Sequence, residues 1–204
     1  MPEAPDFEAL YRRDPDPFRV RTSWYERRKQ GIVLASLCRQ TYPAAWDVAC
    51  GTGDLALALA PRCTQLLATD DSERAVQLTA ELTTGTQVDV RHHSLPADPA
   101  TSAPPTGSTG PFDLIVLAEV LYYLTKEARM ATYALVDDAA KPVAEVVAVH
   151  WRHRPHDAHL SGADVNRELG EVLARRRWSV AVRHDDQDFA LTSWVREAAG
   201  QEAG

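Results

Sequence analysis

The segment WDVACGTGDLA, residues 46–56, constrains the fold more than any other part of this 204-residue chain. A short apolar run that carries one acid leads into Gly51 and Gly53, and small and apolar residues follow. Such glycines let the backbone turn sharply and approach a ligand without an intervening Cβ, and the helix after them directs free N–H groups at the same point. The segment therefore predicts a strand, a tight turn and a helix, as in α/β proteins that bind a nucleotide-type cofactor.

Composition predicts a single domain over residues 1–204, because a chain of this length with 45% hydrophobic residues can bury one core and is short for two. The N-terminal residues are polar and acidic, unlike a signal peptide, and no apolar run approaches the roughly 20 residues of a membrane span. Cys38, Cys50 and Cys63 have neither a metal-binding spacing nor the even number of a disulfide framework. We expect a cytoplasmic protein without a membrane partner.

Strand and helix patterns alternate through most of the chain, which is typical of a parallel sheet covered by helices. Apolar or alternating runs predict strands over residues 46–50, 66–69, 87–91, 112–117, 143–149, 179–183 and 189–195. Helical spacing predicts helices over 24–39, 73–82 and 126–138, and another that begins near Ser161 or Asp164. The connection between the last two strands is too short for a parallel crossover, so they are expected to form an antiparallel hairpin. Segment 96–111 is expected to be a loop.

The glycine pattern alone leaves the cofactor open. Gly51-Thr-Gly53-Asp-Leu-Ala56 fits the dinucleotide-binding pattern, and Asp70 stands about 20 residues further on, where the ribose-binding acid of an NAD site belongs. Asp47, inside the first strand, favours S-adenosylmethionine (SAM) instead, because a carboxylate attracts the ammonium of an aminoacyl group and repels a pyrophosphate. The C-terminal antiparallel hairpin favours the same cofactor.

The segment FDLIVLAEVLYYL, residues 112–124, resembles the class I SAM-dependent methyltransferases, and in particular the NodS (nodulation protein S) branch. Characterised members of that branch N-methylate the amino sugar of a chitooligosaccharide. Residues 16–27 and 59–63 extend the resemblance, which covers about 16–196. It implies a Rossmann-like class I methyltransferase fold, with a seven-stranded, mostly parallel sheet over about 45–196 and an N-terminal arm and lid helix over about 1–40. SAM is the implied cofactor, and S-adenosylhomocysteine (SAH) is its product.

The resemblance also assigns cofactor-binding roles to individual residues. Those implied to hold the methionine end are Asp47, Ala49, Gly51 and Gly53. Those implied to hold the ribose and adenine are Asp70, Asp71, Ser94 and Leu95. Those implied to surround the sulfonium, which aromatic faces attract, are Trp24, Tyr25 and Ala118. Two of these depart from the family pattern: Ala49 stands where many members have glycine, and Ser94 where an aspartate often binds the adenine.

Glu119, just after the predicted strand 112–117, is the main catalytic candidate. Methyl transfer is an in-line displacement, for which the enzyme supplies mainly proximity and orientation. An amine must be neutral to attack, and a nearby carboxylate can position it and accept its proton. Tyr122 and His150 are expected to line the pocket as further catalytic residues.

Histidines recur every third residue from His150 to His159. This run could bind a metal, contact the substrate or form a solvated loop. Pro155 prevents one continuous helix here, and zinc and iron sites usually take ligands from more than one element. We expect no metal site.

These observations lead to the hypothesis of a SAM-dependent methyltransferase that N-methylates a small-molecule amine, such as an amino sugar or a secondary metabolite. The net charge of −7 favours a neutral or cationic acceptor and argues against a nucleic-acid partner. Three alternatives remain open. They are O-methylation of a natural-product hydroxyl with His150 as the base, SAM binding without catalysis, and an NAD-dependent oxidoreductase.

Overall fold

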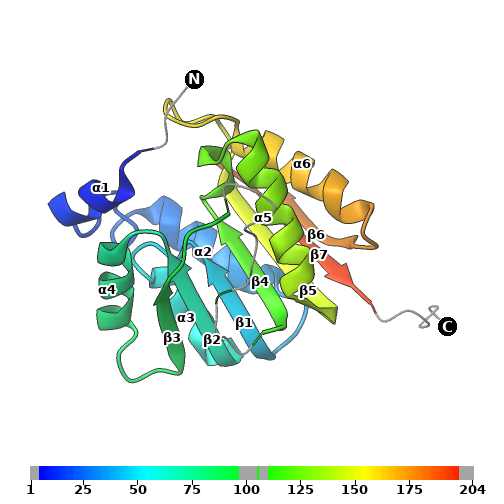
Figure 1. Ribbon diagram of the computed structural model, residues 1–204, viewed down its shortest axis with the longest axis horizontal. Coiled ribbons are helices and arrows are strands. Elements are labelled where there is room, and N and C mark those ends of the chain that lie inside the picture. The colour runs from blue at the N-terminus through cyan, green and yellow to red at the C-terminus, as the bar shows by residue number, and fades with distance from the viewer. Residues whose placement is uncertain (1–4, 97–104, 106–109, 198–204) are drawn as a thin grey trace.

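The computed structural model describes residues 5–96, 105 and 110–197. Seven strands form one sheet in the order β3–β2–β1–β4–β5–β7–β6, as Figure 1 shows. β1 to β5 run parallel, whereas β7 is antiparallel to both of its neighbours, β5 and β6. The strands are β1 Tyr42–Val48, β2 Cys63–Asp70, β3 Val88–His92, β4 Phe112–Ala118, β5 Ala140–Trp151, β6 Ser179–Asp185 and β7 Phe189–Arg196. The predicted α/β sheet with a C-terminal antiparallel hairpin is confirmed.

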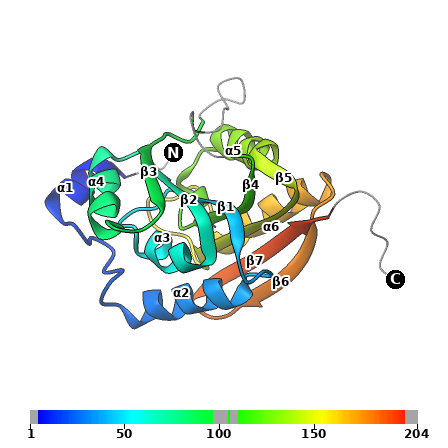
Figure 2. The ribbon, with the colours of Figure 1, turned by 90° about the horizontal axis from the view of Figure 1, so that it is seen from below.

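Helices cover both faces of the sheet (Figures 1 and 2). α5 and α6 contribute to one buried cluster, and α2 and α3 to the cluster on the opposite face. α4 packs against β2 and β3, and α1 packs against α4. The helices are α1 Phe7–Arg13, α2 Trp24–Ser36, α3 Asp54–Leu59, α4 Glu73–Leu82, α5 Lys126–Ala139 and α6 Gly162–Ala174, with 3-10 turns η1 Ala60–Arg62 and η3 Leu121–Tyr123.

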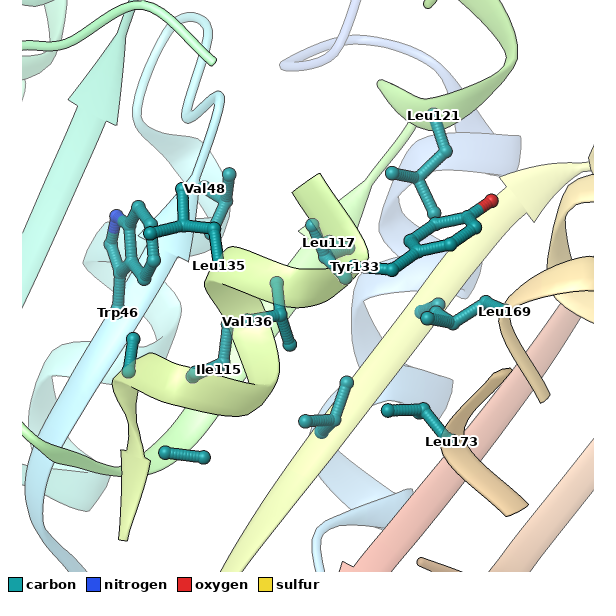
Figure 3. Close-up of a cluster of buried hydrophobic side chains, with 14 of the residues drawn as sticks. Trp46, Val48, Ile115, Leu117, Leu121, Tyr133, Leu135, Val136, Leu169 and Leu173 are labelled. Atoms are coloured by element: carbon teal, nitrogen blue, oxygen red, sulfur yellow. The ribbon is translucent and has the colours of Figure 1, made fainter. Parts of the chain in front are cut away.

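The central strand β4 is buried on both faces because successive side chains alternate between the two clusters. Ile115 and Leu117 join the cluster under α5 and α6, whereas Leu114 and Val116 join the one under α2 and α3. Figure 3 shows the first cluster, in which Trp46 of β1 lies among aliphatic side chains of β4 and α5. A strand buried on both sides reads as a continuous apolar run, which is how the sequence predicted it.

Several element boundaries differ from the expectations, and one helix was not expected. α2 ends at Ser36 and not at residue 39, because Leu37 is extended and the Cys38 N–H donates to the carboxylate of Glu145. β5 begins at Ala140, directly after α5, so no separate turn precedes it. α1, Phe7–Arg13, lies before residue 24, where no helix was expected. Most of the predicted loop 96–111 lies outside the described residues. None of the described helices is long and apolar enough to cross a membrane.

Candidate functional site

A cavity of about 760 Å³ opens at the carboxyl ends of β1, β2 and β4. β1 lies between β2 and β4, so the chain leaves it toward one side of the sheet and later returns on the other. Such a reversal of strand order opens a crevice at the carboxyl ends of parallel strands. α1, α2 and the residues between them supply further parts of the wall. Eleven of the predicted site residues line it: Tyr25, Asp47, Ala49, Gly51, Asp70, Asp71, Ser94, Leu95, Ala118, Glu119 and Tyr122.

The turn after β1 combines several left-handed residues. Gly51 has φ +58°, and a Cβ there would lie 3.0 Å from the hydroxyl of Tyr11. Ala49 has φ +59°, so the alanine that replaces the usual glycine keeps the left-handed conformation. Gly53, with φ +82°, does not line the cavity, because it packs against α4, where a Cβ would lie 2.7 Å from Thr79 Cγ2. Its role is to let α3 begin close to α4.

Asp47 carries a carboxylate oxygen that lacks a partner. The residue is 1% exposed, and its Oδ2 accepts no hydrogen bond. Burial, together with the nearby charge of Asp70, raises the pKa of Asp47 to about 7. A buried carboxylate of this kind is costly until a cation or a strong donor pairs with it. The base of the cavity is therefore suited to a positively charged group.

Asp70, at the end of β2, is held by backbone donors. Its Oδ2 accepts from the Gly51 N–H and its Oδ1 from the Ser72 N–H, both at 2.9 Å. Each oxygen keeps a second acceptor position, which two neighbouring hydroxyl groups could occupy. Asp71 and Ser94, linked by a hydrogen bond, continue the wall beside it. This side of the cavity can accept hydrogen bonds from a sugar and contact a flat ring.

Glu119 is the centre of the opposite side. It has φ +56°, a left-handed conformation that is strained for a glutamate, and its N–H donates to Val149 O at 2.9 Å. Its Oε1 accepts from Lys29 Nζ at 2.6 Å and from the Tyr25 hydroxyl at 3.2 Å. Its Oε2 accepts from the Tyr122 hydroxyl at 2.5 Å and from the Trp151 N–H at 2.8 Å. Four donors therefore hold this carboxylate.

The contacts around Glu119 favour its ionised, negatively charged form. Burial opposes it, but the Lys29 ammonium, the His150 ring and the hydrogen bond from the Trp151 N–H together outweigh burial, so the pKa of Glu119 lies below its ordinary value. Glu119 therefore stays ionised and is a weak proton acceptor. It can orient a polar partner and stabilise positive charge on that partner.

Lys29 is not among the predicted site residues, yet it is 6% exposed and contacts Glu119 directly. Its Nζ also lies 2.9 Å from the carboxylate of Glu26 and 4.8 Å from the centre of the Tyr25 ring. A signal was present: Tyr25, Lys29 and Val33 recur every four residues, which places the lysine on the buried face of α2. Other lining residues that the sequence did not indicate are Tyr11, Phe18, Glu26 and Tyr123.

Trp24 is not where the resemblance implied. It is 71% exposed, it does not line the cavity, and its ring lies 6.0 Å from the Arg27 guanidinium carbon. At the start of α2 only one of two adjacent aromatic residues can face the core. Tyr25 occupies that position and packs edge-on against Phe189.

His150 also lies away from the cavity. Side chains of β5 alternate, so Val149 and Trp151 line the cavity, whereas His150 points to the opposite face toward α6. Its Nδ1 is 2.9 Å from Asn166 Oδ1, and its Nε2 accepts from the Leu121 N–H at 3.2 Å. Burial lowers the pKa of His150 to about 4, so the ring is neutral. These contacts position η3 and, with it, Tyr122. The expectation that His150 itself lines the pocket is wrong.

The rest of the histidine run is dispersed. His153 Nε2 lies 3.0 Å from Gln187 O, and the side chain of His156 is 96% exposed. Within the part of the chain that the structure describes, no group of three or more His, Cys, Asp or Glu side chains is placed to hold a metal ion.

Known proteins with similar sequences or folds include members of the nodulation protein S family. The family model of nodulation protein S matches residues 6–140. A candidate methyltransferase of known structure from Pseudomonas syringae is 32% identical, with a TM-score of 0.68 over 85% of this chain and 100% of that one. NodS from Bradyrhizobium japonicum WM9, an N-methyltransferase solved with SAH, is 21% identical and shares the fold, with a TM-score of 0.73 over 94% and 99% of the two chains.

The curated relatives are longer than the matched region. Nodulation protein S of Bradyrhizobium diazoefficiens is 33% identical over 123 residues, which cover 56% of this chain and 52% of that protein. The chain thus spans about half the length of the curated relatives that it matches.

Proposed function

The chain belongs to the nodulation protein S family, and from this premise we propose that it transfers a methyl group from SAM to an amine of a small molecule. The observation that carries the proposal is the pair of buried carboxylates, Asp47 and Asp70, in one cavity whose opposite wall holds Glu119. A SAM molecule has an ammonium for the first and ribose hydroxyls for the second. An NAD pyrophosphate would meet uncompensated negative charge at the same place, so the oxidoreductase alternative is abandoned.

The residues present fit the cofactor. The unpartnered Oδ2 of Asp47 would receive the ammonium of the methionine end. The free acceptor positions of Asp70 would receive the two ribose hydroxyls, and the wall of Asp71, Ser94 and Leu95 would contact the adenine. When bound, SAM supplies an electrophilic methyl group on a cationic sulfur. The protein's task is then to orient the acceptor and to stabilise the charge that develops on it.

Glu119 favours an amine as that acceptor. As an amine attacks the methyl group, positive charge moves onto its nitrogen, and a fixed carboxylate nearby stabilises this charge. The amine has to arrive neutral, because Glu119 is held ionised by Lys29 and is a weak base. A methylated ammonium can lose its proton to water after transfer. Under this proposal Glu119 is an electrostatic catalyst more than a general base, which revises the first hypothesis.

A hydroxyl acceptor would need a general base, and His150, the residue expected to be that base, does not line the cavity. His150 is fully buried, and both of its ring nitrogens are already engaged. Glu119 has a lowered pKa and four donors around it, so it is poorly suited to remove a proton from a hydroxyl. These contacts support N-methylation over O-methylation.

The test combines cofactor binding with product detection. Calorimetry should show binding of SAH and none of NADH. The protein is incubated with SAM and parallel panels of amines, amino sugars and hydroxyl compounds. Only compounds with an amine should gain about 14 Da per transferred methyl group, the mass of CH₂. Glu119→Gln should lower product formation about 100-fold, whereas Glu171→Gln, an exposed glutamate on α6, should not.

Three results would contradict the proposal. NADH binding without SAH binding would return the oxidoreductase alternative. SAH binding without product from any acceptor would favour a protein that binds SAM without catalysis. Products from hydroxyl compounds alone would favour O-methylation.

A further inference from the structure

Lys29 forms a buried ionic cluster with Glu26 and Glu119 in the wall of the cavity. Its ammonium lies between the carboxylates of Glu26 and Glu119, at 2.9 and 2.6 Å, and the residue is 6% exposed. Removing charges from water is costly, and a buried ion pair is often no more stabilising than apolar side chains of the same volume. Stability is therefore a weak reason for a lysine at this position of α2.

We propose that Lys29 is a positioning residue, whose ammonium holds the Glu119 carboxylate ionised and aimed at the site where the acceptor binds. This inference rests on the proposed function, in which Glu119 meets the acceptor amine. Lys29 binds Oε1, while Tyr122 and the Trp151 N–H bind Oε2, so the carboxylate plane is held from both sides. The strained φ of Glu119 already directs the side chain into this cluster.

Among the described groups around Glu119, Lys29 supplies the positive charge. α2 supplies Tyr25, Glu26 and Lys29, η3 supplies Tyr122 and Tyr123, and β5 supplies the Trp151 N–H, with the neutral ring of His150 on the other face of the strand. Among these described side chains, Lys29 is the one that carries a positive charge. Without it Glu26 and Glu119 would repel each other, and one of them would take up a proton.

The charge of Lys29 is itself secured by the cluster. Burial works against the ammonium, but the carboxylates of Glu119 and Glu26 outweigh burial and raise the pKa of Lys29. Lys29 is therefore a fixed cation and not a proton donor in the reaction. Its effect on the acceptor passes through Glu119.

The experiment compares Lys29→Met, which keeps an unbranched side chain one atom shorter and removes the charge, with Lys29→Arg, which keeps the charge. The titration of Glu119 is followed by NMR in protein labelled with ¹³C at glutamate carboxyl groups, with Glu119→Gln to assign the signal. Lys29→Met should raise the titration midpoint of Glu119 by about 1 to 3 pH units, and Lys29→Arg should leave it near the wild-type value. With an acceptor amine that stays neutral over the range of this titration, the acid limb of the kcat/KM profile should also move upward, with KM for SAM nearly unchanged.

A folded Lys29→Met protein in which Glu119 titrates as in the wild type would overturn the inference. If Lys29→Met does not fold, Glu26→Gln serves instead, because it leaves Glu119 as the sole carboxylate on Lys29. This variant should keep or lower the midpoint of Glu119, and a rise would overturn the inference. Neither the NMR titration nor SAH calorimetry needs an acceptor. A shifted titration without any methylated product would therefore count against the proposed function alone.

Discussion

Asp47→Asn is expected to stabilise the protein without its cofactor and to weaken binding of SAH. Asp47 is 1% exposed, and its Oδ2 has no hydrogen-bond partner. A carboxylate that is kept unpaired for a ligand destabilises the folded state until that ligand arrives. Asparagine has nearly the same shape and no charge, so the substitution tests the charge alone.

The magnitude follows from the pKa. Burial raises the pKa of Asp47 from 3.8 to about 7. The folded state therefore binds a proton at Asp47 more tightly than the unfolded state. The loss of folding stability caused by ionised Asp47 is absent well below pH 3.8, grows up to about pH 7 and is constant above. One pH unit corresponds to about 1.4 kcal/mol, which gives at most about 4 kcal/mol at pH 8 and about 1.6 kcal/mol at pH 5. The buried amide of asparagine lacks a full set of partners and costs about 1–3 kcal/mol, which leaves a net gain of about 2 kcal/mol at pH 8.

Thermal unfolding at the two pH values measures this effect. At pH 8 the variant should melt about 4–8 °C above the wild type, and at pH 5 the difference should nearly vanish. Calorimetry should show SAH binding weakened about 10- to 100-fold, the equivalent of one charged hydrogen bond. Asp138→Asn, at an exposed position of α5, is the control and should change neither quantity. If Asp47→Asn were no more stable than the wild type at pH 8, or if its advantage were equal at both pH values, the reasoning would be refuted.

Three further predictions concern the turn and the buried histidine. Ala49→Gly should raise the free energy of unfolding by about 0.5–1 kcal/mol in urea, because φ is +59° and relief of left-handed strain exceeds the added flexibility of glycine; a lower midpoint would contradict this. Gly53→Ala should destabilise by about 2–3 kcal/mol in the same assay, because its Cβ would lie 2.7 Å from Thr79 Cγ2 at φ +82°; wild-type stability would show that α4 can move aside. His150→Phe should lower the melting temperature through a loss of about 1–3 kcal/mol, because the buried Leu121 N–H loses its acceptor; unchanged stability together with abolished methylation would restore a chemical role for His150.

The sheet could be predicted from the sequence because its signals are local. α4 begins and ends where the pattern of apolar residues placed it, at Glu73 and Leu82. The short link before Phe189 allowed only an antiparallel pair, and β6 and β7 form one. α1 could not be predicted in the same way. It has seven residues, too few to be stable alone, and it is held by tertiary contacts such as that of Glu8 with Ser72 and the Arg74 N–H.

The candidate site was predictable where a residue follows a strand directly. Asp70 and Glu119 end or follow parallel strands, and such strands bring their carboxyl ends to one edge, so chain position alone placed them together. Lys29 and Trp24 lie on a helix, where the direction of a side chain depends on which face packs against the sheet. His150 lies on a strand buried on both faces, and hydrophobicity cannot tell the two faces of such a strand apart.

The sequence by itself determined the kind of sheet, the glycine turn and the acids at its carboxyl edge, because strand periodicity and backbone conformation act over a few residues. The tertiary structure decided which side chains meet across that edge. It turned His150 toward α6, left Trp24 exposed, and placed Lys29 of α2 against Glu119, 90 residues away in the chain. These placements depend on how α2 and β5 pack, and packing is a property of the whole fold that no short segment of the chain contains.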